Sequence, residues 1–263
     1  MRLGILRGIP IVALAVVSLI AGSTPASANH SWSTYHWART SNSFTLQLGN
    51  NMSSLWPSYL GQTSTDWNAN TTAFPTVLAT AIVAGTSGGN CRAVAGTTQV
   101  CNKNYGFNGW LGLASIWISG GHITQGTAKM NDSYFGLSTY NNPNEKQHVV
   151  CQEVAHTFGL AHQDESGASL NTCMDYFSNT GANATSTLST KPNAHDFEQL
   201  ATIYGAHTDS TSTVKAIAVT PTKGAAADGT PFGASPARGA YYLEDLGNGQ
   251  YLLTHVFWAP RGR

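Results

Sequence analysis

A short stretch from Gln152 to His162, with the sequence QEVAHTFGLAH, constrains this chain more than any other. A helix advances about 100° per residue, so Gln152 and His156 would stand one turn apart on one face, with Glu153 a quarter-turn round. Gly159 can leave the right-handed helix without a Cβ penalty, so the chain can turn there and bring His162 back towards His156. The spacing therefore predicts that an amide, a carboxylate and two imidazoles converge on one point.

This spacing resembles the long zinc signature of the metzincin metallopeptidases, H-E-x-x-H-x-x-G-x-x-H, in every specified position except the first, which is Gln152 here. The resemblance implies an α+β catalytic domain with a twisted mixed sheet, an active-site helix, a Met-turn and a C-terminal helix. It also implies a zinc ion held by Gln152, His156 and His162, with Glu153 as general base. An amide oxygen is a weaker donor to zinc than an imidazole nitrogen, so Gln152 predicts weaker metal binding. The alternative is an ordinary amphipathic helix with two hydrogen-bonded histidines, which does not account for Gly159.

A second motif, Cys173-Met174-Asp175-Tyr176, follows a polar segment after the third signature residue. It resembles the metzincin Met-turn, which implies that Met174 lies under the metal site. In astacins and serralysins, a tyrosine at the position of Tyr176 is a mobile extra ligand or oxyanion donor, which implies a catalytic role for Tyr176. Matrixins lack this tyrosine, so the resemblance is to more than one subfamily. Taken alone, Met174 would be read as a core residue.

Further similarity to matrixins extends over about residues 44–205. Gly112-Leu113-Ala114 and the tract after Gly121 are similar to the matrixin approach to the strand that holds the substrate. Residues 192–205 resemble the final matrixin helix, with Asn193 or Asp196 as its cap. The alternation at 122–131 predicts a sheet-edge strand, and the apolar run at 111–119 predicts a buried central strand.

The other expected elements follow from periodicity and turn residues. Alternation predicts a strand at 44–48, and Ser53 or Ser54 could cap a helix that runs to about residue 68. An apolar run at 76–85 predicts another strand, and the signature helix is expected over 145–158. Residues 29–43 have no period and are expected to form an extended arm.

Four histidine or acidic positions outside the signature have simpler interpretations. His122 is expected to be a surface histidine at a strand end, because the signature already supplies a metal set. His148 lies one turn before Gln152, too far along the helix axis to replace it as a ligand. His195 and Asp196 are expected to be helix-start and capping residues.

The chain has four cysteines, Cys91, Cys101, Cys151 and Cys173, which allow three pairings. We favour Cys91 with Cys101, which would close a short loop of small and polar residues. We favour Cys151 with Cys173, because that bridge would tie the signature helix to the Met174 segment. A zinc site made by cysteines is the alternative, but the paired C-x-x-C spacing is missing.

The N-terminus predicts export. Arg2 and Arg7 precede an apolar run at 9–20, and Ala26 and Ala28 supply the small residues for cleavage before Asn29. An uncleaved membrane anchor is the alternative. Residues 1–28 are therefore expected to be a signal peptide, the protein to be secreted and extracellular, and the mature chain not to enter a membrane.

Composition and turn residues divide the mature chain. Residues 29–207 are expected to be the metallopeptidase-like domain, 208–239 a flexible Ser/Thr- and Gly/Ala/Pro-rich linker, and 240–263 a β-hairpin extension that turns at Asn248-Gly249. An isolated hairpin is marginal in water, so it should dock on the domain or on a partner.

Composition and motif together predict a function. Only 10% of residues are charged and the net charge is +0, so nucleic acid is not an expected partner. The motif implies a monomeric secreted zinc metalloendopeptidase that acts on protein or peptide substrates. A metzincin-shaped binding protein with weak or no hydrolysis, and an adhesive domain that works through the hairpin, are the alternatives.

Overall fold

The computed structural model describes residues 30–56, 58–69, 77–205, 207–212, 230–231 and 240–260. The predicted signal peptide at 1–28 and most of the predicted linker at 208–239 lie outside these residues. Within the described part of the chain, no helix is both long and apolar enough to cross a membrane.

Helices and strands are interspersed as far as residue 204, and the described residues beyond it form strands only. In chain order the elements are β1 (His36–Trp37), β2 (Phe44–Asn51), α1 (Tyr59–Asn68), β3 (Leu78–Ala84), the 3-10 turn η1 (Gly88–Asn90), β4 (Thr97–Lys103), β5 (Trp110–Ser119), β6 (His122–Asn131), α2 (Asp132–Phe135), α3 (Pro143–His156), the 3-10 turn η2 (Gly181–Asn183), α4 (Ala194–Tyr204), β7 (Thr230–Pro231), β8 (Tyr241–Gly247) and β9 (Gln250–Trp258).

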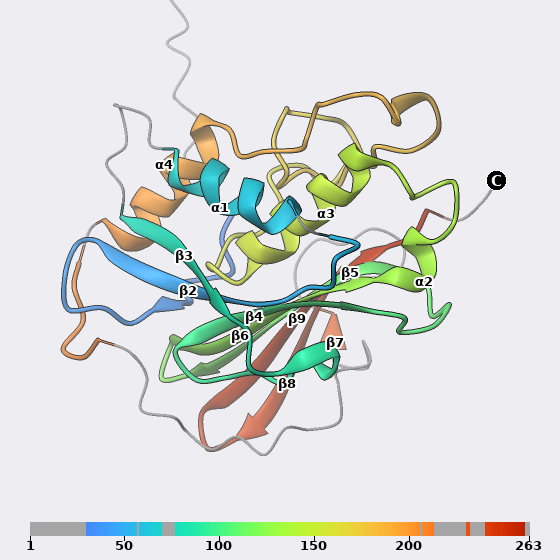
Figure 1. The fold of residues 1–263 in the computed structure, drawn as a ribbon. Helices are drawn as coiled ribbons and strands as arrows, with labels where there is room; N and C mark the ends of the chain where they lie inside the picture. The colour runs from blue at the N-terminus through green and yellow to red at the C-terminus, as the bar shows by residue number, and fades with distance from the viewer. Residues whose placement is uncertain are drawn as a thin grey trace, which may run out of the picture.

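The described strands form one mixed sheet of nine strands in the order β3-β2-β4-β6-β5-β9-β8-β7, with β1 paired to β6. Strands β2, β3, β4 and β6 are parallel, whereas β5 and the strands beyond it are antiparallel. In Figure 1, helices α1, α3 and α4 lie on one side of this sheet, and the C-terminal hairpin continues the sheet beyond β5. This mixture of helices and a mixed sheet is compatible with the predicted α+β class.

The central position of β5 is confirmed, but the edge position expected for 122–131 is wrong. Strand β6 pairs with β4 on one side and with β5 on the other. The polar residues within this strand, Thr124, Gln125 and Thr127, are buried rather than solvated, and Thr124 donates a hydrogen bond to the carbonyl of Trp117. Alternation was a misleading signal because buried hydroxyls can be satisfied inside the sheet.

Helices α3 and α4 begin directly after capping residues, whereas α1 does not begin where its cap was expected. Asn142 caps α3 and accepts a hydrogen bond from the amide of Glu145. Asn193 and Asp196 form a capping box at α4, so both predicted caps take part. The helix expected from Ser53 or Ser54 begins only at Tyr59, since Ser53 instead forms a turn with the amide of Trp56 and contacts Asn102.

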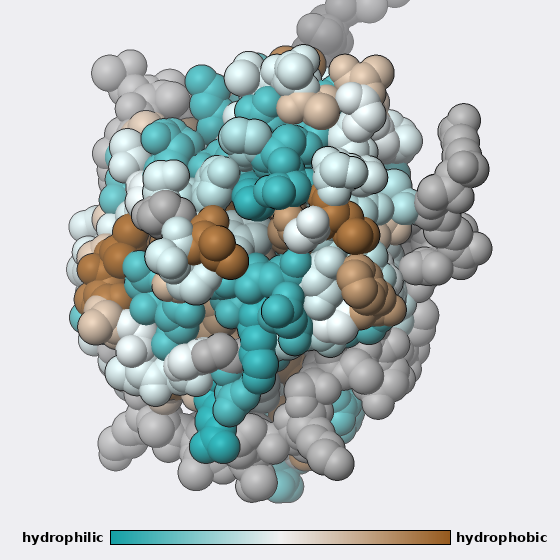
Figure 2. All heavy atoms as spheres, turned by 45° about the vertical axis from the view of Figure 1, so that its right-hand side comes forward, coloured by the Kyte–Doolittle hydropathy of each residue, from teal (hydrophilic) through white to brown (hydrophobic). Residues whose placement is uncertain are grey.

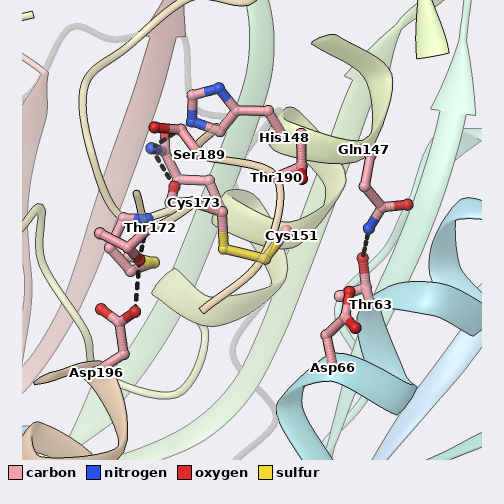
Figure 3. The surroundings of a disulfide bond; sticks show 12 residues. Thr63, Asp66, Gln147, His148, Cys151, Thr172, Cys173, Ser189, Thr190 and Asp196 are labelled. Carbon is pink, nitrogen blue, oxygen red and sulfur yellow. Dashed lines mark hydrogen bonds between the residues drawn. A yellow bond between two sulfur atoms is a disulfide. The ribbon is translucent and has the colours of Figure 1, made fainter. Parts of the chain in front are cut away.

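Both predicted disulfides, Cys91–Cys101 and Cys151–Cys173, are present. Figure 3 shows the second bridge joining helix α3 to the segment that precedes Met174. In the same region, the hydroxyl of Thr172 donates to the carboxylate of Asp196 in α4. The bridge and this hydrogen bond hold the Met174 segment between the two helices.

The outer surface in Figure 2 carries small separate hydrophobic patches among hydrophilic side chains. The large exposed hydrophobic residues of the described chain, such as Leu55 and Phe107, are far apart in sequence and come from different segments.

Gly159 makes the turn that follows α3. It has φ of 97°, and a Cβ atom there would collide with the carbonyl oxygen of Tyr35. We therefore expect Gly159→Ala to lower the free energy of unfolding by about 1–3 kcal/mol. Gly61→Ala is the matched control, because Gly61 lies in α1 with open space around it and should gain up to about 1 kcal/mol. Chemical denaturation of both variants measures the difference, and equal stability would contradict the expectation.

Candidate metal centre

Two histidines of the 152–162 motif and one from the C-terminal hairpin meet beside helix α3. His156 ends that helix, His162 follows the Gly159 turn, and His255 lies on β9 of the C-terminal hairpin. One ring nitrogen from each lies within 4.8 Å of the others. The predicted pair His156 and His162 is therefore brought together, and His255 joins it.

A hydrogen bond at Nδ1 fixes the orientation of each of these three imidazole rings. Nδ1 of His156 lies 2.8 Å from the carbonyl oxygen of Leu160, and Nδ1 of His162 lies 3.0 Å from Oε1 of Glu165. Nδ1 of His255 lies 3.0 Å from Oε2 of Glu153. The Leu160 carbonyl can only accept, so Nδ1 of His156 carries the proton and its Nε2 carries a lone pair. Ionised carboxylates at Glu165 and Glu153 favour the same tautomer in His162 and His255.

The three Nε2 atoms are buried and have no hydrogen-bond partner among the described residues. Burial also lowers the pKa of His156 and His255 well below the ordinary histidine value, and that of His162 to about 4. Neutral rings with free lone pairs and a fixed opposite nitrogen are the form in which histidine binds a metal. The cluster could therefore hold a metal ion.

Glu153 lies directly beside this cluster. Its side chain is buried, and its Oε1 has no hydrogen-bond partner in the described part of the chain, while Oε2 accepts from His255. Burial raises its pKa well above the ordinary value. A Cβ at Gly112 of β5 would come within 2.7 Å of the Glu153 side chain, so that glycine makes the room. Glu153 can orient His255 through one oxygen and exchange a proton through the other.

The motif implies that the amide oxygen of Gln152 is a metal ligand, and the structure shows what its amide nitrogen does. Its Nε2 donates hydrogen bonds of 2.7 Å to the backbone carbonyls of Cys173 and Asp175. Its Oε1 is buried without a hydrogen bond to any described residue. The amide thus fastens α3 to the Met174 segment. His148, one turn earlier, contacts Asn179 and the carbonyl of Asp175 rather than the cluster.

The predicted Met-turn residues lie next to the signature. Met174 is fully buried, and its carbonyl accepts from the amide of Gln163, the residue after His162. The ring of Tyr176 lies 5.1 Å from that of His162, and its hydroxyl accepts from the amide of Trp258 on β9. Tyr176 is therefore close to the cluster and is attached to the hairpin.

The C-terminal hairpin covers one side of the three-histidine cluster. Tyr241 of β8 packs its ring 5.1 Å from His162, and its hydroxyl accepts from the His162 amide. On the other side, Trp32 stacks on His156 with ring planes 1° apart. Glu153, His156 and His255 are all 0% exposed, so a large substrate cannot reach them in this conformation.

Sequence reasoning missed His255. The residue lies 93 positions after His162, beyond the predicted linker, and belongs to no local motif. One feature of the sequence could have indicated this residue. Thr254 and His255 interrupt an otherwise apolar strand, and a polar side chain in a buried strand requires a hydrogen-bond or metal partner.

No protein-family model matches this chain, and no curated protein matches it. The function is therefore argued from the residues of the centre itself.

Proposed function

We propose that this protein is a secreted zinc-dependent endopeptidase of the metzincin type. The observation that carries the proposal is the set of three orphaned Nε2 atoms beside the buried carboxyl group of Glu153. Three imidazoles that leave a further position open are the ligand set of catalytic zinc. The paired disulfides agree with an oxidising, extracellular location.

The arrangement of elements supports the metzincin assignment. The resemblance implies a mixed sheet, an active-site helix, a Met-turn and a C-terminal helix. The mixed sheet, the helix that carries Glu153 and His156, the Met174 segment tied to that helix and the final helix α4 agree with this expectation. The ligand set departs from that family, because His255 takes the place that the motif gives to Gln152.

The residues fit zinc on chemical grounds. Imidazole nitrogen suits zinc, and each ring has its second nitrogen bonded to an acceptor, as metal-binding histidines do. Zinc bound there would polarise a peptide carbonyl and make water more acidic.

Glu153 would be the general base. It would take a proton from the attacking water on Oε1 and pass it to the leaving amine as the peptide bond breaks. The Tyr176 hydroxyl lies on the same side, beside His162, where it could donate to the developing oxyanion once the hairpin releases it. Access of a substrate requires movement of the hairpin, because β9 pairs with β5 along most of its length.

A second function is favoured by one observation, the complete burial of the centre. Structural metal sites are closed, whereas catalytic ones keep a position open. In that case the metal would fasten the hairpin to the domain, and the protein would be an extracellular binding protein without hydrolysis.

A metal-dependence experiment separates the two functions. Residues 29–263 are incubated with an unfolded protein as substrate, first as purified, then with a chelator, then with added Zn²⁺. We expect cleavage that the chelator abolishes and Zn²⁺ restores, with bound zinc measured by mass spectrometry in each sample. Zinc bound tightly without cleavage under any condition would overturn the peptidase proposal in favour of the binding protein.

A further inference from the structure

A second histidine cluster lies away from the centre. It consists of His36, His122, His207 and Asp209, and we call it the Asp209 cluster. Oδ1 of Asp209 lies 3.3 Å from Nε2 of His36, 3.2 Å from Nε2 of His122 and 3.7 Å from Nε2 of His207. Nε2 of His207 lies 3.1 Å from Nε2 of His36. The ligand atoms of His36, His122 and Asp209 thus all lie within 4.8 Å of one another, and Nε2 of His207 lies beside two of them.

The fold brings these residues together from three segments. Strand β1 pairs with β6 in parallel, with His36 opposite His122, so the two side chains emerge side by side. His207 and Asp209 belong to the segment that follows helix α4, and this segment places Asp209 against His36 and His122. His122 was expected to be a surface histidine at a strand end. That expectation did not include its place in a cluster with His36, His207 and Asp209.

Arg39 fixes the orientation of the carboxylate. Its backbone amide donates to Oδ2 of Asp209 at 2.9 Å, and its guanidinium donates to the carbonyl of His207 at 2.6 Å. The Asp209 amide in turn donates to the Arg39 carbonyl at 2.7 Å. Arg39 itself is 1% exposed. These contacts occupy Oδ2 and leave Oδ1 for the three rings, as outer partners do for metal ligands.

One contact of the cluster, between Nε2 of His36 and Oδ1 of Asp209, has no proton when the His36 ring is neutral. Nδ1 of His36 lies 2.6 Å from the carbonyl oxygen of Thr34 and must carry the proton in the neutral ring. Its Nε2 lone pair then faces both the Asp209 carboxylate and Nε2 of His207. Lone pairs that face one another repel, unless a proton or a cation lies between them.

The distances match a cation. A tetrahedral zinc ion with bonds of about 2.0–2.1 Å separates its ligand atoms by about 3.3 Å. The three distances to Oδ1 of Asp209 and the distance between His36 and His207, from 3.1 to 3.7 Å, lie close to this value. We propose that the Asp209 cluster is a second metal site, which binds zinc or a similar divalent transition metal through three imidazoles and one carboxylate.

The site would act as a structural clamp. It joins β1, the start of β6 and the segment after α4, which are far apart in sequence. The ion can reach it from solvent, because the side chains of His122 and His207 are 36% and 43% exposed. The Asp209 cluster shares no residue with the metal centre at His156. An experiment on one site therefore does not decide the function of the other.

Without a metal, the same cluster would be a network of hydrogen bonds and ion pairs between the three histidines and Asp209. Although burial acts in the opposite direction, hydrogen bonds from Arg39, His122 and His36 lower the pKa of Asp209 to about 2. An anionic carboxylate suits either state, so metal stoichiometry is what separates them.

The test is zinc stoichiometry at equilibrium. Residues 29–263 are stripped with a chelator, dialysed against Zn²⁺ and analysed by mass spectrometry, beside His122→Gln, His207→Gln and His195→Gln. We expect the first two variants to lose one equivalent of zinc relative to the unmodified chain. His195→Gln, which changes a histidine outside both clusters, should lose none. Circular dichroism checks folding, and the use of two exposed positions keeps the test valid if one variant misfolds.

A His255→Ala background isolates the second site. There, Zn²⁺ should still bind at one equivalent and raise the melting temperature, and Co²⁺ should give the visible absorption of a tetrahedral site. His122→Gln in that background should abolish both effects. If both cluster variants retain the zinc content of the unmodified chain, the Asp209 cluster is only an ion-pair network and the proposal is wrong.

Discussion

Replacing His255 with alanine is expected to weaken zinc binding at the centre by more than about 100-fold, since even outer partners of metal ligands contribute 10–100-fold. The side chain supplies one of three orphaned Nε2 atoms, and its Nδ1 is already fixed by Glu153. Peptide cleavage should fall with the loss of zinc. Competition with a chelator of known affinity measures the first effect, and a fluorogenic peptide measures the second.

Gln152→Ala is the matched comparison for this variant. Its Nε2 is bonded to the carbonyls of Cys173 and Asp175, so we expect zinc affinity to stay within a few-fold. Stability should drop by about 1–3 kcal/mol, because two buried carbonyls lose a donor. The reverse pattern, with zinc lost in Gln152→Ala and kept in His255→Ala, would return the ligand role to Gln152. Faster cleavage by His255→Ala would show that His255 blocks the site rather than building it.

Glu153→Gln is expected to reduce peptide cleavage by about 10²–10⁴-fold, the usual contribution of a general base. The amide keeps the size of the side chain and can still accept from Nδ1 of His255, so zinc content should not change. The amide cannot take up the proton of water. Steady-state kinetics should show the loss in kcat more than in KM, with zinc measured on the same samples.

Glu145→Gln controls for the removal of a buried carboxyl group from the same helix. Glu145 is in the first turn of α3, where it accepts from the amide of Asn179 and the hydroxyl of Ser178. It lies far along α3 from the histidine cluster, so its loss should act on stability and leave the activity of the folded fraction unchanged. If Glu153→Gln and Glu145→Gln lost the same fraction of activity, the result would contradict a catalytic role for Glu153.

The position of the hairpin connects these two predictions. Strand β9 carries His255, pairs with β5 and donates to Tyr176, while β8 places Tyr241 against His162. An enzyme built this way cannot shed its C-terminal hairpin without losing a ligand. Its substrate must enter through a local opening of the hairpin, whereas a binding protein would have no need of one.

Local sequence determined the parts of the fold and site that depend on neighbours along the chain. The 152–162 spacing placed His156, Glu153 and His162, because a helical turn and one glycine suffice to orient them. The caps of α3 and α4 and the turn at Asn248-Gly249 are likewise local hydrogen bonds or local φ preferences. Both disulfides followed from spacing and position.

Tertiary structure alone decided the rest. Strand order is set by long-range pairing, so alternation could not tell that β6 is interior while the hairpin extends the sheet. The same pairing carries His255 to His156 and brings His122 to Asp209, joining residues that no fixed spacing relates. A sequence motif can predict ligands that one helix and its following turn hold. A ligand from another strand depends on the register of the sheet, so it can be identified only in the folded structure.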